Sequence, residues 1–325
     1  GLGDVYKRQG AYSATAPFDC PKSKRILERG CEALARRMKA DPDAGNPIVR
    51  SLNALALLSS GKRKYLPLVR RQVAWASRYS DPKRRDYHSW FYGPINILLA
   101  EYVLATGDRR FLPDLKRITM EIVRGQSAVG SWGHRFVQSN GRLAGYGMMN
   151  APGLPLTLSL VLARKAGVDD PALDAAIDKS ARLMRFYVGK GSVPYGDHRP
   201  WIQTHDDNGK NGAAALLFHH LGDVEAATWF AHMSVASHGA ERDTGHTGNF
   251  FNMLWAMPGV ALSGPHATGA WMKEFGWYYD LARRWDGTYL HQGPPAARPD
   301  SYNGWDCTGA YLLAYAQPLK KIHLT

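Results

Sequence analysis

Two kinds of helical segment alternate along this chain, and this alternation restricts the fold more than any other feature of the sequence. In the first kind, apolar residues recur at steps of three and four, as Ile26, Leu27, Leu34 and Met38 do. Such spacing gives a helix with one buried stripe and an opposite face in water. We expect these amphipathic helices at residues 21–40, 65–79, 110–124, 171–188, 223–237 and 268–284.

The second kind of segment is short and apolar on nearly all sides, which is typical of buried helices. We expect these helices at residues 47–59, 94–106, 151–166, 210–221, 248–257 and 308–318. Most begin beside Gly, Asn or Pro, which favour helix N-caps and first turns. Strand-like alternation is nearly absent. Six amphipathic helices that alternate with six buried helices predict an all-α (α/α)6 toroid. A solenoid of helix pairs would show a similar pattern, but no polar capping repeat is visible.

The links between the segments are unequal in length. Links from a buried to an amphipathic segment are short, whereas most of the reverse links are long, at residues 80–93, 125–150, 189–209 and 285–307. Long links inside a compact domain are usually functional or disordered, and these are rich in histidine and aromatic residues. In an alternating ring they all lie on the face that carries the N-termini of the inner helices. We therefore expect the functional site there.

Carboxylates in these links are candidates for acid/base chemistry. Asp206 and Asp207 precede one inner segment, and because both cannot cap it, one is free to act as a general acid. Glu241 and Asp243 precede the next inner segment and supply the second carboxylate that glycoside hydrolysis needs. The simpler alternatives are helix caps and solvated surface for the first pair, and a salt bridge with Arg242 for the second. Four further candidates for acid/base roles are His205, His246, Tyr195 and His198.

Aromatic and polar residues of the same links are candidates for substrate binding. Aromatic platforms with polar groups between them suit sugar rings, although the same side chains can simply pack long loops down. The candidates are Trp90, Trp132, His134, Tyr146, Asn150, Arg199, Trp201, Lys210, Trp305 and Asp306. Asn150 is also a candidate helix cap, and Arg199 would neutralise a uronate in a lyase. A zinc site formed by Cys307, Asp306 and His246 is an alternative, although a buried Cys is more often a packing residue.

Charge and composition exclude several classes of protein. The 41 basic and 28 acidic residues give a net charge of +13, and the surplus lies in residues 1–125. No nucleic-acid motif accompanies it, so we expect a solvated helical surface, with attraction to an acidic polymer as the alternative. No apolar run reaches the roughly 20 residues that span a membrane. The 3 cysteines contain no C-x-x-C pair, which excludes a disulfide scaffold.

The first residues differ in character from the rest of the chain. Residues 1–9 lack a methionine and resemble translated adapter sequence of the kind found in metagenomic assemblies. We expect residues 1–19 to be non-native or disordered and residues 20–325 to form one toroid domain. A lost signal peptide would fit an extracellular or periplasmic protein, and further domains of a longer chain are compatible with this start.

Three motifs carry a resemblance to a known family. They are Tyr-Gly-Met-Met-Asn-Ala-Pro at 146–152, His-Asp-Asp-Asn-Gly-Lys-Asn-Gly at 205–212 and Asn-Gly-Trp-Asp-Cys-Thr-Gly at 303–309. Together they resemble a bacterial family of uncharacterised domains over most of residues 20–325, which implies no particular activity. More distantly, the architecture is similar to the six-hairpin glycosidases, the polysaccharide lyases, and the terpenoid-cyclase and protein-prenyltransferase toroids.

These observations predict a carbohydrate-active enzyme without a cofactor, acting on a poly- or oligosaccharide. Hydrolysis is favoured over lyase chemistry. One alternative is a zinc-dependent transferase or cyclase. The other is a non-catalytic module that binds glycans or peptides, against which the many titratable groups of the links argue.

Overall fold

The computed structural model describes residues 10–82, 88–143, 145, 147–200, 209–237, 250–291, 302 and 304–325. Across these residues no β-strand forms, and β structure is confined to isolated bridges. The inner helices are α3 (Pro47–Ser59), α5 (His88–Thr106), α7 (Asn150–Lys165), α9 (Lys210–Leu221), α12 (Phe250–Ala261) and α14 (Thr308–Ala316). The outer helices are α2 (Pro21–Ala40), α4 (Leu66–Ala76), α6 (Leu112–Arg124), α8 (Pro171–Arg185), α10 (Val224–Ala236) and α13 (Pro265–Ala282).

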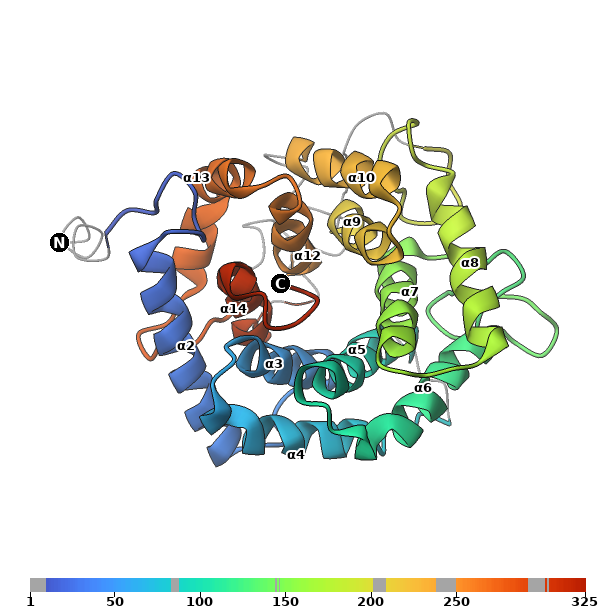
Figure 1. The fold of residues 1–325 in the computed structure, drawn as a ribbon, viewed down its shortest axis with the longest axis horizontal. Coiled ribbons are helices and arrows are strands. Elements are labelled where there is room, and N and C mark those ends of the chain that lie inside the picture. Colours follow the sequence, from blue (N-terminus) through green and yellow to red (C-terminus); the bar gives the residue numbers. More distant parts are fainter. Residues whose placement is uncertain are drawn as a thin grey trace.

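The inner helices form a closed ring, and the outer helices surround it (Figure 1). Each inner helix contacts the next one along the chain, and α14 returns to pack against α3 and α2. This return closes the ring, which an open solenoid of helix pairs would not do. The prediction of an (α/α)6 toroid is confirmed.

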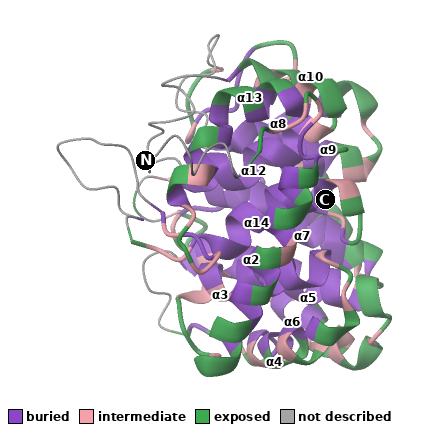
Figure 2. Ribbon diagram, turned by 90° about the vertical axis from the view of Figure 1, so that its left-hand side faces the viewer, coloured by how far each residue is buried: buried purple, intermediate pink, exposed green. Residues whose placement is uncertain are grey.

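The two layers follow from the two kinds of sequence pattern. On α2, the predicted stripe of Ile26, Leu27, Leu34 and Met38 is buried against the inner ring. The inner helices are buried on nearly all sides, and the outer helices keep their polar faces exposed (Figure 2). The Asn46 side chain caps α3 by accepting hydrogen bonds from the next two backbone N–H groups, at 3.0 and 3.1 Å.

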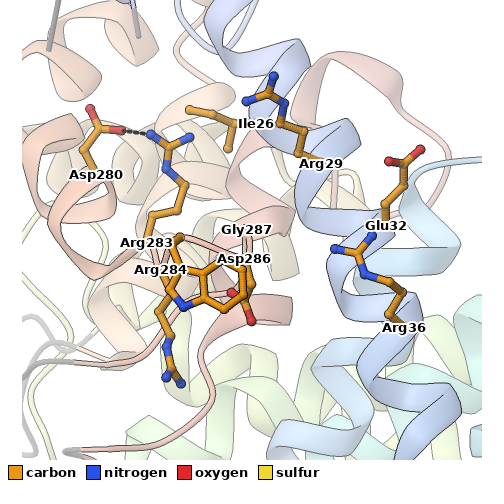
Figure 3. Close-up of a pocket in the computed structure, with 10 residues that line it drawn as sticks. Ile26, Arg29, Glu32, Arg36, Asp280, Arg283, Arg284, Asp286 and Gly287 are labelled. Carbon is orange, nitrogen blue, oxygen red and sulfur yellow. Dashed lines mark ion pairs between the residues drawn. The ribbon is translucent and has the colours of Figure 1, made fainter. Parts of the chain in front are cut away.

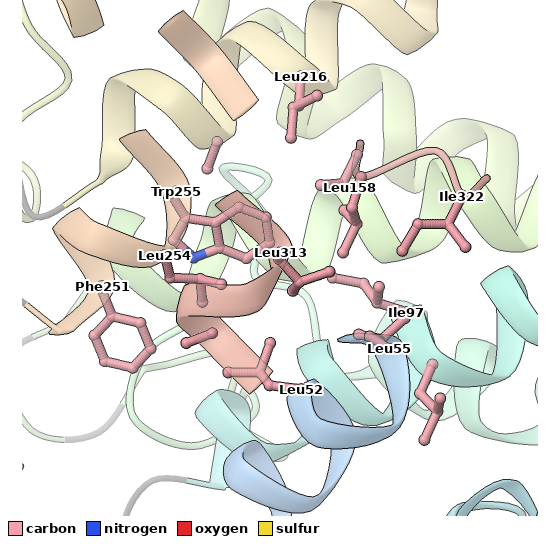
Figure 4. Close-up of a cluster of buried hydrophobic side chains, with 14 of the residues drawn as sticks. Leu52, Leu55, Ile97, Leu158, Leu216, Phe251, Leu254, Trp255, Leu313 and Ile322 are labelled. Carbon is pink, nitrogen blue, oxygen red and sulfur yellow. The ribbon is translucent and has the colours of Figure 1, made fainter. Parts of the chain in front are cut away.

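Side chains from all six inner helices fill the middle of the ring. Figure 4 shows Leu52 and Leu55 of α3, Ile97 of α5, Leu158 of α7, Leu216 of α9, Leu254 of α12 and Leu313 of α14 in one cluster. Ile322, from the segment after α14, joins the same cluster. Burial of this many apolar side chains is the main source of stability for such a ring.

The C-terminal segment closes the ring at the end where the inner helices finish. The buried carboxylate of Glu101, on α5, accepts hydrogen bonds from the backbone N–H groups of His323 and Leu324, at 3.0 and 2.9 Å. The His323 ring lies 3.1 Å from the same carboxylate. A pocket of about 530 Å³ remains beside this segment, lined among others by His220 and His323. The long links lie at the opposite end, where the inner helices begin.

The largest difference from the expected elements concerns α5. We expected this helix to begin at Pro94, but it begins at His88 and continues through the proline. Pro94 removes one hydrogen bond of the helix, which normally favours a helix end at that point. Here His88, Trp90 and Tyr92 are buried by the tertiary structure, and this burial extends the helix.

Part of the segment that we expected to be non-native or disordered lies within the described residues. Residues 1–9 lie outside the described residues, but residues 10–19 pack against α13 and α14. The Tyr12 hydroxyl donates a hydrogen bond to Asp280 at 3.0 Å and contacts the Tyr315 hydroxyl at 2.8 Å. Residues 10–19 therefore belong to the packed domain.

None of the helices that the structure describes combines the length and the apolar character needed to cross a membrane.

Candidate active site at the N-terminal ends of the inner helices

The long links are joined to one another by backbone hydrogen bonds on the face where the inner helices begin. Met149 N–H donates to the carbonyl of Trp132 at 2.9 Å, and Asn150 N–H donates to the carbonyl of Tyr195 at 2.8 Å. At the start of α5, Ser89 N–H donates to the carbonyl of His134 at 3.0 Å. These bonds fix two links against the inner ring, so side chains from distant parts of the sequence meet at one surface, which we call the mouth.

A continuous row of aromatic rings crosses the mouth. Trp90 of α5 lies 5.0 Å from Phe251 of α12, which lies 5.3 Å from Tyr302. Tyr302 in turn lies 4.7 Å from Trp305, just before α14. Three of these rings are buried and Trp305 is half-buried, so the row is a rigid floor with one partly open end. Edge and tilted contacts of this kind hold aromatic rings in place.

His134 lies beside this floor and its protonation pattern is defined by a neighbour. The indole N–H of Trp90 donates to Nδ1 of His134 at 3.2 Å. Because an indole nitrogen can only donate, Nδ1 acts as acceptor, and the ring proton of the neutral histidine is on Nε2. His134 is half-buried, so part of its ring is accessible at the mouth.

The structure describes only part of the predicted set of acid/base residues. Tyr195 is half-buried at the mouth, and His198 is exposed on the same link. The remaining candidates lie outside the described residues: His205, Asp206, Asp207, Glu241, Asp243 and His246. Their assignment stays a prediction from the sequence.

The predicted binding residues fall into three groups. Trp90 and His134 lie together at one end of the aromatic row, and Trp305 lies at its other end. Arg199 is exposed on the link that carries Tyr195. Tyr146 and Trp201 lie outside the described residues. Trp132, Asn150 and Lys210 are buried, and Asp306 belongs to a network at the start of α14.

Trp132 and Asn150 act inside the fold. The Trp132 indole is fully buried and donates to the carbonyl of Ile122 at 2.9 Å, so it has no face open to a sugar. Asn150 is the first residue of α7, not its cap, and its amide donates to the carbonyls of Pro194 and Gly196 at 2.8 and 3.2 Å. It therefore fixes the following link instead of contacting a ligand.

Lys210 is the first residue of α9 and is almost fully buried. The next residue, Asn211, holds the preceding link by accepting from Val193 N–H at 3.3 Å and donating to the Ser192 hydroxyl at 3.0 Å. The predicted anion site at this helix start has no exposed ammonium group. This does not support Lys210 as a binding residue.

Asp306 and Cys307 also have structural roles. Asp306 accepts from Asn53 at 2.9 Å, accepts from the backbone and hydroxyl of Thr308 at 3.1 and 2.5 Å, and pairs with Arg37 at 3.2 Å. Both carboxylate oxygens are therefore occupied at the start of α14. Cys307 is fully buried, and burial raises the pKa of its thiol. His246, the third residue of the zinc alternative, lies outside the described residues, so that alternative stays a prediction from the sequence.

A polar cluster that sequence reasoning missed lies beside the mouth, between α5 and α6. His88 Nδ1 lies 3.1 Å from a carboxylate oxygen of Asp81, and the Tyr92 hydroxyl donates to Glu121 at 2.6 Å. A cavity of about 290 Å³ is lined by these residues. Because we expected a link over residues 80–93, the helical spacing that aligns His88 with Tyr92 went unrecognised. The His88 ring also packs between Tyr92 and Phe136, at 4.6 and 4.3 Å, which indicates a structural role.

Comparison with known proteins identifies relatives of this chain. A family model described as "Domain of unknown function (DUF6288)" matches residues 23–325. The comparison with curated proteins gives no match. Among solved structures, a glycosyl hydrolase family 88 protein from Bacteroides vulgatus aligns with 92% of this chain and 99% of its own, at TM-score 0.55 and 13% identity. A polysaccharide lyase aligns with 84% of this chain and 72% of its own, at TM-score 0.38 and 12% identity. The first alignment shows a shared fold.

Proposed function

The chain belongs to the DUF6288 family of domains of unknown function, and from its site we propose that it is a carbohydrate-active enzyme. The substrate is a poly- or oligosaccharide that binds at the mouth. Within this class, a glycoside hydrolase agrees best with the sequence, and a polysaccharide lyase is the other form of the proposal.

The observation that carries the proposal is the aromatic floor with His134 beside it. Sugar rings have apolar faces and hydroxylated edges, so they bind where an aromatic surface adjoins hydrogen-bond donors and acceptors. The half-buried ring of Trp305 supplies an apolar surface, and the Nε2–H of His134 supplies a donor. Tyr195 adds a half-buried hydroxyl-bearing side chain on the neighbouring link.

The bond-breaking chemistry is assigned to carboxylates of the links. A glycosidic bond breaks when an acid protonates the leaving oxygen while a second carboxylate activates water or attacks the sugar. One member of this pair is proposed to be Asp206 or Asp207, which precede α9. The other is proposed to be Glu241 or Asp243, which precede α12. These starts are neighbours because α9 packs against α12. In the lyase form of the proposal, Tyr195 or His198 removes a proton and Arg199 neutralises the uronate.

The test is turnover of a polysaccharide panel, assayed separately for new reducing ends and for unsaturated uronates. Hydrolysis produces only reducing ends, whereas lyase cleavage also produces the unsaturated product. With an active substrate in hand, four single variants follow: Asp206→Asn, Asp207→Asn, Glu241→Gln and Asp243→Asn. We expect one member of each pair to lower kcat by about 100-fold or more, which is the usual effect of losing general acid/base catalysis.

Asp178→Asn is the matched control, because Asp178 is exposed on the outer helix α8. It should leave kcat unchanged, and all variants should keep the wild-type melting temperature. Full activity in all four carboxylate variants would refute the hydrolase assignment. Saturable glycan binding without any product would instead identify a binding module.

A further inference from the structure

A second surface feature lies on the rim of the toroid, between α2 and the end of α13. A pocket of about 400 Å³ is lined on one side by Arg29, Glu32 and Arg36, which share one face of α2. Arg284 and Trp285, just after α13, line the other side. Figure 3 shows Arg29 and Arg36 on α2 facing the segment that carries Arg283 and Arg284.

The carboxylates of this pocket are already engaged. Asp280 binds Lys22 at 2.6 Å, and Glu32 pairs with Lys64 at 3.5 Å. Asp286 accepts from the backbone and hydroxyl of Thr288, at 2.9 and 2.7 Å. Asp280 and Glu32 are therefore paired with lysines, whereas the Asp286 carboxylate keeps its charge close to Arg284.

Three arginines of the pocket lack such a partner. Within the part of the chain that the structure describes, Arg29, Arg36 and Arg284 form no ion pair within 4.0 Å, and each is exposed. A guanidinium group presents several N–H donors in a plane, which matches the two oxygens of a carboxylate. Arg29 and Arg36 on α2 and Arg284 after α13 thus place three guanidinium groups around one pocket, with Asp286 as the carboxylate near Arg284.

Trp285 stands out among the apolar residues of this protein because its side chain is 96% exposed. It is held in that position by a tight turn. Arg284 N–H donates to the Thr288 carbonyl at 2.8 Å, and Gly287 N–H donates to the Arg284 carbonyl at 3.1 Å. Gly287 has φ of 90°, which glycine adopts without strain. The exposed indole is therefore presented by a pre-organised backbone, which lowers the entropic cost of binding.

We propose that this pocket binds an acidic oligosaccharide, with Trp285 stacked on a sugar ring and Arg29, Arg36 and Arg284 bound to its uronate carboxylates. An aromatic ring with adjacent arginines matches the two halves of such a sugar, its apolar face and its anionic edge. The choice of a glycan over another polyanion rests on the proposed function, while the anionic character rests on the arginines.

The location of the pocket agrees with an auxiliary site for the same substrate. Trp285 begins the link that ends at α14, and this link also carries Trp305 of the mouth. Leu290 forms a bridge with Asp306, so the two ends of the link are joined. A polysaccharide bound at Trp285 would thus extend over one link to reach the aromatic floor.

The test is titration calorimetry with an oligogalacturonate and with its methyl ester, which has the same rings without the charges. The protein carries Asp206→Asn and Asp207→Asn to suppress turnover. We expect binding of the acid form only, and we expect Trp285→Ala or Arg36→Ala to weaken it by about tenfold. Binding should also weaken as salt increases, because exposed charges are screened.

The controls are Trp277→Ala, a half-exposed tryptophan on α13 outside the pocket, and Arg182→Ala, an exposed arginine on α8. Both should bind like the parent protein. Three results would each overturn the inference. The methyl ester could bind as tightly as the acid form, or the Trp285 variant could bind the acid form as tightly as the parent protein. Oligo-dT or polyglutamate could bind more tightly than the oligogalacturonate. If the acid form binds through Trp285 but no glycan is ever cleaved, the proposed function fails and this site stands. If a glycan is cleaved but the Trp285 and Arg36 variants bind the acid form like the parent protein, the proposed function stands and the rim site fails.

Discussion

At the scale of single residues, buried polar groups tie the end of the chain to the ring. Nε2 of His220, on α9, lies 2.9 Å from the carbonyl of His323 and donates to it. Burial lowers the pKa of His220 from 6.5 to about 4. The folded protein therefore holds this histidine in its neutral form over a range where the unfolded chain would charge it.

This difference predicts a loss of stability in acid. Above about pH 6.5 the residue is neutral in both states and has no effect, whereas between pH 6.5 and 4 only the unfolded chain takes up the proton. We expect His220 to lower the free energy of unfolding by at most about 2 kcal/mol at pH 5 relative to pH 7.5. Urea unfolding at the two pH values measures this. His220→Gln should remove that part of the change and His219→Gln, at an exposed site, should not. Equal pH dependence in wild type and His220→Gln would contradict the assignment.

Residue roles were the hardest feature to predict from the sequence. An aspartate before an inner helix has the same appearance whether it caps the helix or binds a substrate, and Asp306 accepts a hydrogen bond from the first backbone N–H of α14. Trp132 and Trp305 both lie in long links rich in aromatic residues, yet one is fully buried and the other half-buried. How far each tryptophan is buried depends on contacts between links that are distant in sequence. Local sequence patterns do not contain this information. Trp285 was missed because its partners on α2 lie about 250 residues away.

At the scale of elements, close approach of inner helices depends on a few glycines. A Cβ added at Gly212 of α9 would run into the carbonyl of Trp255 on α12. One added at Gly259 would collide with Gly212 itself. Here the neighbour is backbone, which cannot move aside without shifting a helix.

We therefore predict opposite effects for two glycine substitutions in helices. Gly212→Ala should lower the free energy of unfolding by about 3 kcal/mol, because a backbone clash separates α9 from α12. Gly153→Ala, in α7, should be neutral or stabilising by up to about 1 kcal/mol, because its new methyl group has its closest neighbour at 3.5 Å and alanine favours a helix. Thermal and urea unfolding of both variants test this. Similar stability of the two would contradict the described packing.

Helix bounds were predicted well where caps and periodicity agree. The ranges of α2, α3 and α9 coincide with the predicted ranges, because Pro47 opens α3 after an asparagine cap and Gly222 ends α9 with φ of 78°. The prediction failed at α5, where Pro94 reads as a helix start but lies inside the helix. Local propensity was overridden there by burial of the preceding aromatic residues.

At the scale of the whole molecule, the two ends of the ring differ. The C-terminal segment and Glu101 fill the end where the inner helices finish. The long links, the aromatic floor and the basic rim pocket lie where they begin. The shared face of the long links follows from the alternation of inner and outer helices and was predictable from link lengths, whereas the packing of the C-terminal segment on Glu101 was not predicted.

The central claim is that the described mouth contacts the substrate. It is tested most directly by kcat and KM of Trp305→Ala and His134→Ala on the best substrate of the panel, with Trp277→Ala as control. We expect the Trp305 variant to raise KM by about tenfold through loss of stacking, and the His134 variant to lower kcat/KM by about tenfold or more through loss of a hydrogen bond. If both variants fold like the wild type and keep kcat/KM within about twofold of the control, the mouth is not the substrate site.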